Sequence, residues 1–138
     1  MTTGEAQLHI GRGGDDFARG AAEFSSLLIR AGVGERPRFN AELVFEELVT
    51  NVIRYGDAGG DPLVEITVRV TPEQVVLVIC DRGSPFDPLA RPDPTPPGSL
   101  AEATVGGLGI MLARKAASSL AYERSDGRNR VQAVISLH

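Results

Sequence analysis

Cysteine and lysine are almost absent from this sequence. Cys80 is the only cysteine in 138 residues, so an internal disulfide and a metal cage built from cysteines are excluded. Because Cys80 ends an apolar run at residues 75–80, we expect a buried small hydrophobe rather than a reactive thiol. Lys115 is the only lysine, and the 13 arginines are scattered along a chain of net charge −4 at pH 7. No basic stretch of the kind that binds nucleic acid is visible.

Long apolar runs and clustered metal ligands are also missing. No run approaches the roughly 20 apolar residues that a membrane-spanning helix needs, and no signal-peptide pattern opens the chain. His9 and His138 lie near opposite ends, and neither has a second ligand at metal-binding spacing. We expect a cytoplasmic protein without a membrane partner, in which residues 1–138 form a single domain.

The spacing of the apolar residues predicts both helices and strands. Residues 15–31 and 37–55 carry apolar side chains three and four apart, which is typical of amphipathic helices. Residues 63–70 and 75–80 are rich in β-branched side chains and predict a hairpin. The other expected elements are a strand at residues 7–10, a helix at 108–117 and strands at 119–125 and 130–137 joined at Asp126–Gly127.

A long segment without periodicity interrupts these elements. Residues 84–105 contain six prolines, and loops of this length inside a domain are usually functional lids or disordered. The order is therefore strand, two helices, a hairpin, a long loop, a helix and two strands. This order predicts an α+β fold: a two-layer α/β sandwich with helices on one face of a mixed, mostly antiparallel sheet.

Three short motifs carry candidate chemistry, and the first lies on the second predicted helix. Glu47 and Asn51 are four residues apart, so they lie on one face of that helix. A carboxylate there can accept a proton, and an amide oxygen is a hard ligand that suits Mg²⁺. The alternative interpretation of this spacing is an exposed polar face.

The second and third motifs lie at the ends of predicted elements. Asp81 follows a buried strand and can accept a hydrogen bond from an exocyclic amine such as that of adenine, while Gly83 lets a flat ring approach. The alternative is a plain Asp-x-Gly turn. Residues 106–109 (GGLG) open a helix, where free backbone N–H groups favour phosphate. The alternative is a glycine-rich hinge, and the absence of a following Lys-Ser/Thr excludes a Walker-type loop.

Together the three motifs resemble those of the GHKL ATPase superfamily, which includes gyrase, MutL and the histidine kinases. Glu47 and Asn51 resemble its N-box, and Asp81 with Gly83 its first glycine box. Its second glycine box corresponds to Gly107, Leu108 and Gly109. Within the superfamily the sequence resembles in particular the compact anti-sigma factor/serine-protein kinases of the RsbW type. That resemblance extends from about residue 8 to 137 and is carried by residues 47–55 (ELVTNVIRY), 81–88 (DRGSPFDP) and 106–110 (GGLGI).

The resemblance implies a role for each motif residue and the Bergerat-type ATP-binding fold of the family. Asn51 would hold Mg²⁺, and Glu47 would be the general base that takes the proton of the attacking serine. Asp81 would read the adenine amine, with Gly83 admitting the ring. Gly107, Leu108 and Gly109 would line the phosphates, and residues 84–105 would form the ATP lid.

Two positions depart from the family pattern. Some relatives carry a basic residue just before the second glycine box, where this chain has residues 103–105 (ATV), so Arg91 or Arg54 would have to supply the positive charge. A threonine that relatives often carry in the last hairpin is Asn129 here, which can still exchange a hydrogen bond near adenine.

The function implied by the resemblance is that of an ATP-dependent serine-protein kinase. It would phosphorylate a STAS-type anti-anti-sigma protein and act as an anti-sigma factor in a partner-switching pathway that regulates transcription, with ATP and Mg²⁺ as cofactors and a homodimer as its assembly. The alternative is a nucleotide-regulated module that sequesters a partner without phosphotransfer. Glu47 favours the kinase, because nucleotide binding alone needs no base. The catalytic part of a histidine kinase is disfavoured, because the chain shows no dimerisation helix with a phospho-accepting histidine.

We expect ATP with Mg²⁺ to stabilise the folded protein, because a ligand that binds only the native state adds about 2.7 kcal/mol at 100 times its Kd. Asp81→Asn should remove most of this gain by spoiling the adenine contact. Thermal unfolding with and without nucleotide measures the effect. An unchanged melting temperature at millimolar ATP and Mg²⁺ would contradict the predicted pocket.

Overall fold

The computed structural model describes residues 3–11, 13–55, 63–90 and 105–138. The order of helices and strands is the one expected from the sequence. The elements are β1 (Gly4–Ile10), α1 (Gly14–Arg30), α2 (Glu35–Tyr55), β2 (Val64–Val70), β3 (Gln74–Asp81), the 3-10 helix η1 (Pro88–Ala90), α3 (Val105–Ala116), β4 (Ser119–Ser125) and β5 (Arg128–Ser136).

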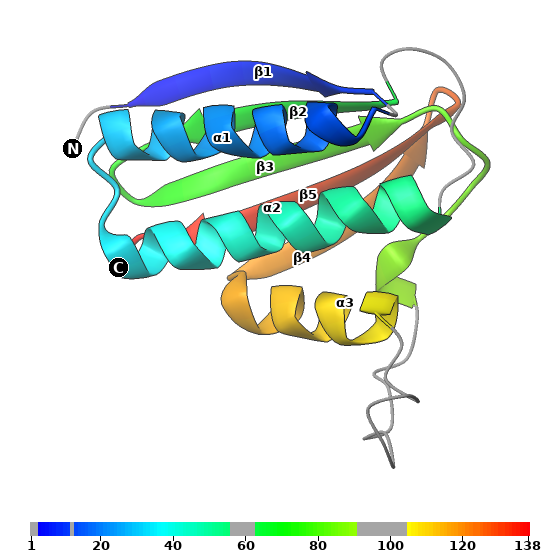
Figure 1. Cartoon of the computed structure of the whole chain (residues 1–138). Helices are drawn as coiled ribbons and strands as arrows, with labels where there is room; N and C mark the ends of the chain where they lie inside the picture. The colour runs from blue at the N-terminus through cyan, green and yellow to red at the C-terminus, as the bar shows by residue number, and fades with distance from the viewer. Residues whose placement is uncertain (1–2, 12, 56–62, 91–104) are drawn as a thin grey trace.

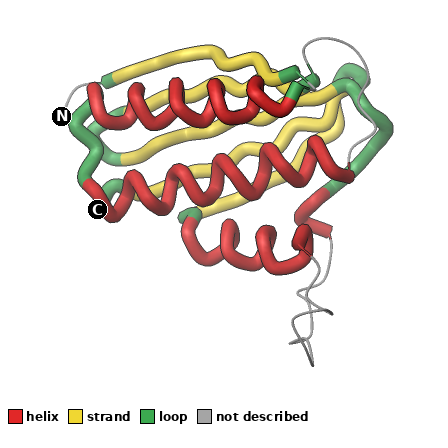
Figure 2. The backbone as a smooth tube through the Cα atoms, in the orientation of Figure 1, coloured by secondary structure: helices red, strands yellow, loops and turns green. Residues whose placement is uncertain are grey.

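The five strands form one sheet in the order β1-β2-β3-β5-β4, and every pairing between them is antiparallel. The helices lie together on one face of this sheet (Figure 1, Figure 2). The predicted two-layer α+β sandwich is therefore confirmed, with an antiparallel rather than a mixed sheet. The last hairpin inserts β5 between β3 and β4, so the strand that carries Asn129 pairs directly with the strand that ends at Asp81.

Alternation along β3 divides its side chains between two different environments. Val75, Leu77 and Ile79 are buried against the helical layer. The intervening side chains point to the other face, on which the described residues place no second layer (Figure 2). Cys80 lies on that face, opposite Glu65 and Arg130, and is half-buried. The expectation of a buried cysteine was wrong, because the period of two places Cys80 on the opposite side from Ile79.

Helix α2 lies between α1 and α3 on the sheet (Figure 1). Its predicted apolar stripe is confirmed: Val44, Leu48 and Val52 are all buried. Phe45 on the same helix stacks on Phe24 of α1, with ring centroids 4.7 Å apart and planes 13° from parallel. This packing fixes the rotation of α2 about its axis and therefore the directions in which its polar side chains point.

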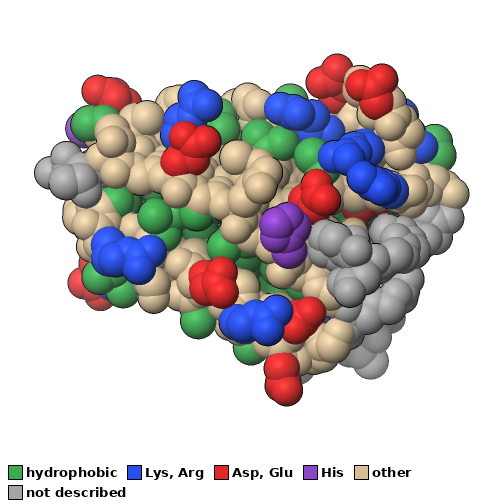
Figure 3. Space-filling model, turned by 90° about the horizontal axis from the view of Figure 1, so that it is seen from above, with side chains coloured by type: hydrophobic (Ala, Val, Ile, Leu, Met, Phe, Trp, Pro, Cys, Tyr) green, Lys and Arg blue, Asp and Glu red, His purple; other side chains and the backbone are tan. Residues whose placement is uncertain are grey.

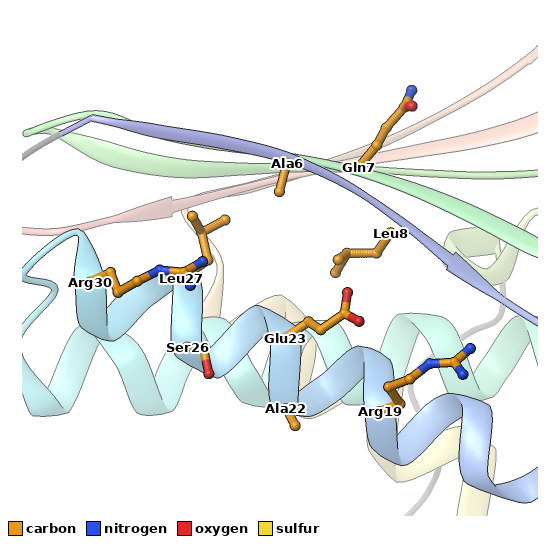
Figure 4. Close-up of a pocket in the computed structure, with 9 residues that line it drawn as sticks. All are labelled: Ala6, Gln7, Leu8, Arg19, Ala22, Glu23, Ser26, Leu27 and Arg30. Atoms are coloured by element: carbon orange, nitrogen blue, oxygen red, sulfur yellow. The ribbon is translucent and has the colours of Figure 1, made fainter.

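Strand β1 is an edge of the sheet, and α1 packs beside it. In Figure 4, Ala6 and Leu8 point toward α1 while Gln7 points to the opposite side, and Leu27 of α1 points back toward the strand.

Seen from the β1 edge, basic and acidic side chains are interspersed on the surface (Figure 3). Among the described residues, no helix is long and apolar enough to cross a membrane.

The start of the predicted lid is not irregular throughout. Asp87 accepts hydrogen bonds from the N–H of Leu89 at its side chain (2.8 Å) and from the N–H of Ala90 at its backbone carbonyl (3.2 Å). These contacts close the 3-10 turn η1. The six prolines had predicted no regular structure in this segment, but a proline such as Pro88 is favourable at the first position of a helical turn. The remainder of the expected lid, residues 91–104, lies outside the described residues.

Candidate functional site

The motif residues are brought together at one end of the molecule. The C-terminal ends of α2 and β3 and the N-terminal end of α3 all lie at this end (Figure 1). Helix α2 supplies Glu47 and Asn51, β3 supplies Asp81, and α3 supplies Gly109. The predicted phosphate-binding residues Gly107 and Leu108 lie in the first turn of α3.

Asn51 is a polar side chain in an apolar environment. It is 3% exposed, in a helix whose neighbouring Val49 and Val52 belong to the core. Neither its Nδ2 nor its Oδ1 has a hydrogen-bond partner among the described residues. Burying an amide without a partner costs about 1–3 kcal/mol, so an amide that no described residue pairs with is available to a ligand or to solvent. The alternative interpretation of Asn51 as part of an exposed polar face is wrong.

Glu47 lies one turn before Asn51 and contacts the start of α3. A Cβ atom added to Gly109 would lie 1.9 Å from Oε2 of Glu47 and 2.9 Å from its Cδ. Glycine at this position therefore lets α3 approach the carboxylate closely, and any side chain there would displace it. The second glycine box thus has a steric role toward Glu47 as well as its predicted role toward phosphate.

The pKa of Glu47 lies above its ordinary value of 4.5. Burial is the largest cause, because it disfavours the charged form, and the negative charge of Glu46 adds to it. Arg54, one of the two candidate sources of positive charge, opposes the shift. A carboxylate with a raised pKa is a better proton acceptor than one held low by an ion pair. Arg91, the other candidate, lies outside the described residues.

Asp81 ends β3 with its side chain 5% exposed. Its Oδ1 accepts two hydrogen bonds, from the N–H of Gly83 (2.9 Å) and from Nδ2 of Asn129 (3.0 Å). Its Oδ2 receives none from the described residues. The Asp-x-Gly turn and the ligand-binding interpretation are therefore compatible, because the turn uses one oxygen and leaves the other for an exocyclic amine.

Asn129 is also buried, at 2% exposure, and makes four hydrogen bonds. Its Nδ2 donates to Oδ1 of Asp81 and to the carbonyl of Ser84 (2.8 Å). Its Oδ1 accepts from the N–H of Phe86 (3.0 Å) and the hydroxyl of Tyr122 (2.6 Å). The structure thus directs the amide of Asn129 to the protein, whereas the sequence had predicted a contact with adenine.

Three functional candidates were missed by the sequence reasoning. Tyr122 orients Asn129, Arg124 donates to the carbonyl of Gly83 (2.6 Å), and Arg114 donates to the carbonyl of Leu89. Both arginines hold the backbone that follows Asp81. Their partners are distant in the sequence: 25 residues separate Arg114 on α3 from Leu89, and 41 residues separate Arg124 on β4 from Gly83. Local patterns along the chain therefore gave no signal for these contacts.

The site suits a Mg²⁺ ion that is held mainly by a nucleotide. Among the described residues, no group of three or more His, Cys, Asp or Glu side chains could hold a metal on its own. Mg²⁺ is usually bound through one or two protein oxygens together with substrate phosphates. The unpartnered Oδ1 of Asn51 fits that requirement.

Comparison with known proteins identifies the family of this chain. The sequence profile of the histidine kinase-like ATPase domain matches residues 16–135. The chain belongs to this family. Serine/threonine-protein kinase BtrW of Bordetella bronchiseptica is 34% identical over 104 residues, which cover 75% of this chain and 73% of BtrW. The resemblance to the GHKL superfamily and its serine-kinase branch is thereby confirmed, and membership of this ATPase family implies that the chain binds ATP.

Two solved structures share the fold of this histidine kinase-like chain. The crystal structure of the RsbU and RsbW domains of Rv1364c from Mycobacterium tuberculosis superimposes with a TM-score of 0.69 at 12% identity, over 96% of this chain and 33% of that one. The present chain therefore spans about a third of that structure. Histidine kinase AdeS of Acinetobacter baumannii gives a TM-score of 0.50 at 16% identity, over 100% of this chain and 70% of AdeS.

The raised pKa of Glu47 predicts a response to its neighbour. Glu46→Gln should lower the pKa of Glu47 toward 4.5, because it removes the charge that raises it. Glu42→Gln, a matched change about one turn earlier, should leave it unchanged. Titration of the Glu47 carboxyl carbon by NMR measures both, and a wild-type value below 4.5 would contradict the structure.

The same shift has a consequence for stability. Because the folded state holds the Glu47 proton more tightly, the contribution of this group to the free energy of unfolding falls as pH rises from the unfolded pKa through the folded one. Glu47→Gln, which mimics the neutral form, should abolish the part of the fall in unfolding free energy with pH that Glu47 causes. Denaturant titrations at several pH values measure this difference.

Proposed function

We propose that this chain is an ATP-dependent serine-protein kinase. The observation that carries the proposal is the half-buried Glu47, with its raised pKa, one helical turn from the amide of Asn51, which has no partner within the described ranges. Nucleotide binding needs the amide, whereas a proton acceptor beside it serves transfer to a hydroxyl. The name of BtrW as a serine/threonine-protein kinase supports the same activity.

The proposed reaction transfers the γ-phosphoryl group of ATP to a serine of a partner protein. The serine oxygen forms a bond to the γ-phosphorus while the bond to the bridging oxygen of ADP breaks, and Glu47 accepts the serine proton. Asn51 would bind Mg²⁺, which neutralises phosphate charge. Oδ2 of Asp81 would accept a hydrogen bond from the adenine amine, and Gly109 would allow the phosphates and Glu47 to approach α3. Such a reaction depends mainly on positioning and charge neutralisation.

The partner in this proposal is a STAS-type anti-anti-sigma protein, and the chain also binds a sigma factor as its inhibitor. These partners, a homodimeric state and a cytoplasmic location rest on the resemblance to the RsbW type. Phosphorylation of the antagonist would make it release the chain, which could then hold the sigma factor, as expected for partner switching in transcription regulation.

Replacement of Glu47 separates the kinase from a nucleotide-regulated binding module. Glu47→Ala should keep ATP affinity nearly intact while lowering phosphotransfer by roughly 10²- to 10⁴-fold, because the general base is lost. The measurement is transfer of labelled phosphate from ATP to a purified STAS-domain protein, alongside calorimetric binding of ATP. Glu42→Gln on the same helix is the matched control and should transfer at the wild-type rate.

Two outcomes would contradict the proposal, one for the role of Glu47 and one for kinase activity itself. An unchanged transfer rate in Glu47→Ala would remove Glu47 from the mechanism. A wild-type protein that binds ATP and its partner but transfers no phosphate would be the binding module.

A further inference from the structure

Asn129 has no hydrogen-bonding capacity left for a ligand. A side-chain amide has two N–H donors and an oxygen with two lone pairs. Both donors are used, on Asp81 and Ser84, and both lone pairs are occupied, by Phe86 and Tyr122. Asn129 was expected to contact adenine, but all its hydrogen bonds go to protein groups, so its effect on nucleotide binding must pass through those groups.

The first effect of Asn129 is on the carboxylate of Asp81. A carboxylate can rotate so that its two oxygens exchange places, because the terminal torsion is broad. Oδ1 is fixed from two sides, by Nδ2 of Asn129 and by the N–H of Gly83. These bonds hold Oδ2, which has no donor among the described residues, in one direction. The carboxylate thereby presents a single free acceptor.

The second effect is on the backbone that follows Asp81. The same amide that holds Oδ1 also binds the carbonyl of Ser84 and the N–H of Phe86, which lie 45 and 43 residues away in the sequence. Arg124 holds the carbonyl of Gly83 beside them. One buried side chain thus links the end of β3 to the first residues of the segment that follows it.

We propose that Asn129 is a positioning residue that aims the free Oδ2 of Asp81 at the base of the nucleotide and ties residues 84–86 to the same strand end. The inference rests on the proposed contact between Asp81 and adenine. The amide group is required, because a threonine hydroxyl has one donor and can serve Asp81 or Ser84 but not both. Tyr122 acts one step further away, by fixing the orientation of the amide of Asn129.

The test compares the Kd of ATP with that of purine riboside triphosphate, which lacks the exocyclic amine of adenine. The wild type should prefer ATP, and Asp81→Asn should lose the preference. Asn129→Ala should reduce the preference by roughly 10- to 100-fold, since the hydrogen bond lost by a buried charged acceptor is among the stronger ones. Asn129→Thr and Tyr122→Phe should reduce it less, because each retains part of the network.

Val131→Ala is the matched control for a purely structural effect. Val131 is buried on the same face of β5, two residues beyond Asn129, and takes no part in the network. This variant should lower the melting temperature while keeping the preference for ATP. Hydrogen exchange at the Phe86 amide should become faster in Asn129→Ala and remain slow in Val131→Ala, because only the first removes its acceptor.

The outcomes distinguish this inference from the proposed function. If the wild type binds no nucleotide, or binds both triphosphates equally, the adenine contact and this inference both fail. If the wild type prefers ATP and the Asn129 variants keep that preference, Asn129 does not position Asp81 and the proposed function stands. Should Asn129→Ala fail to fold, Asn129→Thr and Tyr122→Phe decide the matter by the same comparison.

Discussion

The burial of the Asn51 side chain is the constraint on which the rest of the site depends. Helix α2 packs on the sheet through an apolar stripe, and that stripe fixes its rotation. The same rotation turns Asn51 into the interior, where no described residue pairs with its amide, and places Glu47 against α3. A helix selected for stability alone would carry an apolar residue at position 51, because an unpartnered amide destabilises the fold. A ligand that pairs with the amide of Asn51 would offset the free energy lost by burying it.

The two ends of the proposed nucleotide site are built on different physical principles. At the adenine end, Asp81 and Asn129 are held by hydrogen bonds that leave one carboxylate oxygen without a donor from the part of the chain that the structure describes. At the phosphate end, Glu47 lies close against Gly109, and the amide of Asn51 is buried with no hydrogen-bond partner among the described residues. The first arrangement selects a base by the direction of one acceptor. The second places an amide and a proton acceptor beside Gly109, whose missing side chain lets α3 approach Glu47 closely.

Much of the fold was predictable because local rules decide it. The stripe of α2 has a helical period, and the Asp126–Gly127 turn has positive φ at both residues (54° and 74°), as a tight hairpin requires. The elements that carry the motif residues were predictable for the same reason, because Glu47 and Asn51 are one helical turn apart and Asp81 ends an apolar strand. The non-local contacts were not predictable from local patterns in the sequence. The network around Asn129 forms because β5 pairs with β3 as well as with β4. The contact of Gly109 with Glu47 depends on how closely α3 approaches α2.

The side-chain amide of Asn51 offers the most direct test of the claim that α2 holds a ligand site. Its two N–H resonances can be assigned by NMR from their loss in Asn51→Ser. Addition of ATP with Mg²⁺ should shift both resonances strongly, and ATP with a chelator should shift them less, because the amide then loses its metal partner. If the signals near Asp81 move with Mg²⁺ and ATP while those of the Asn51 side chain stay unchanged, the buried amide is not part of the site.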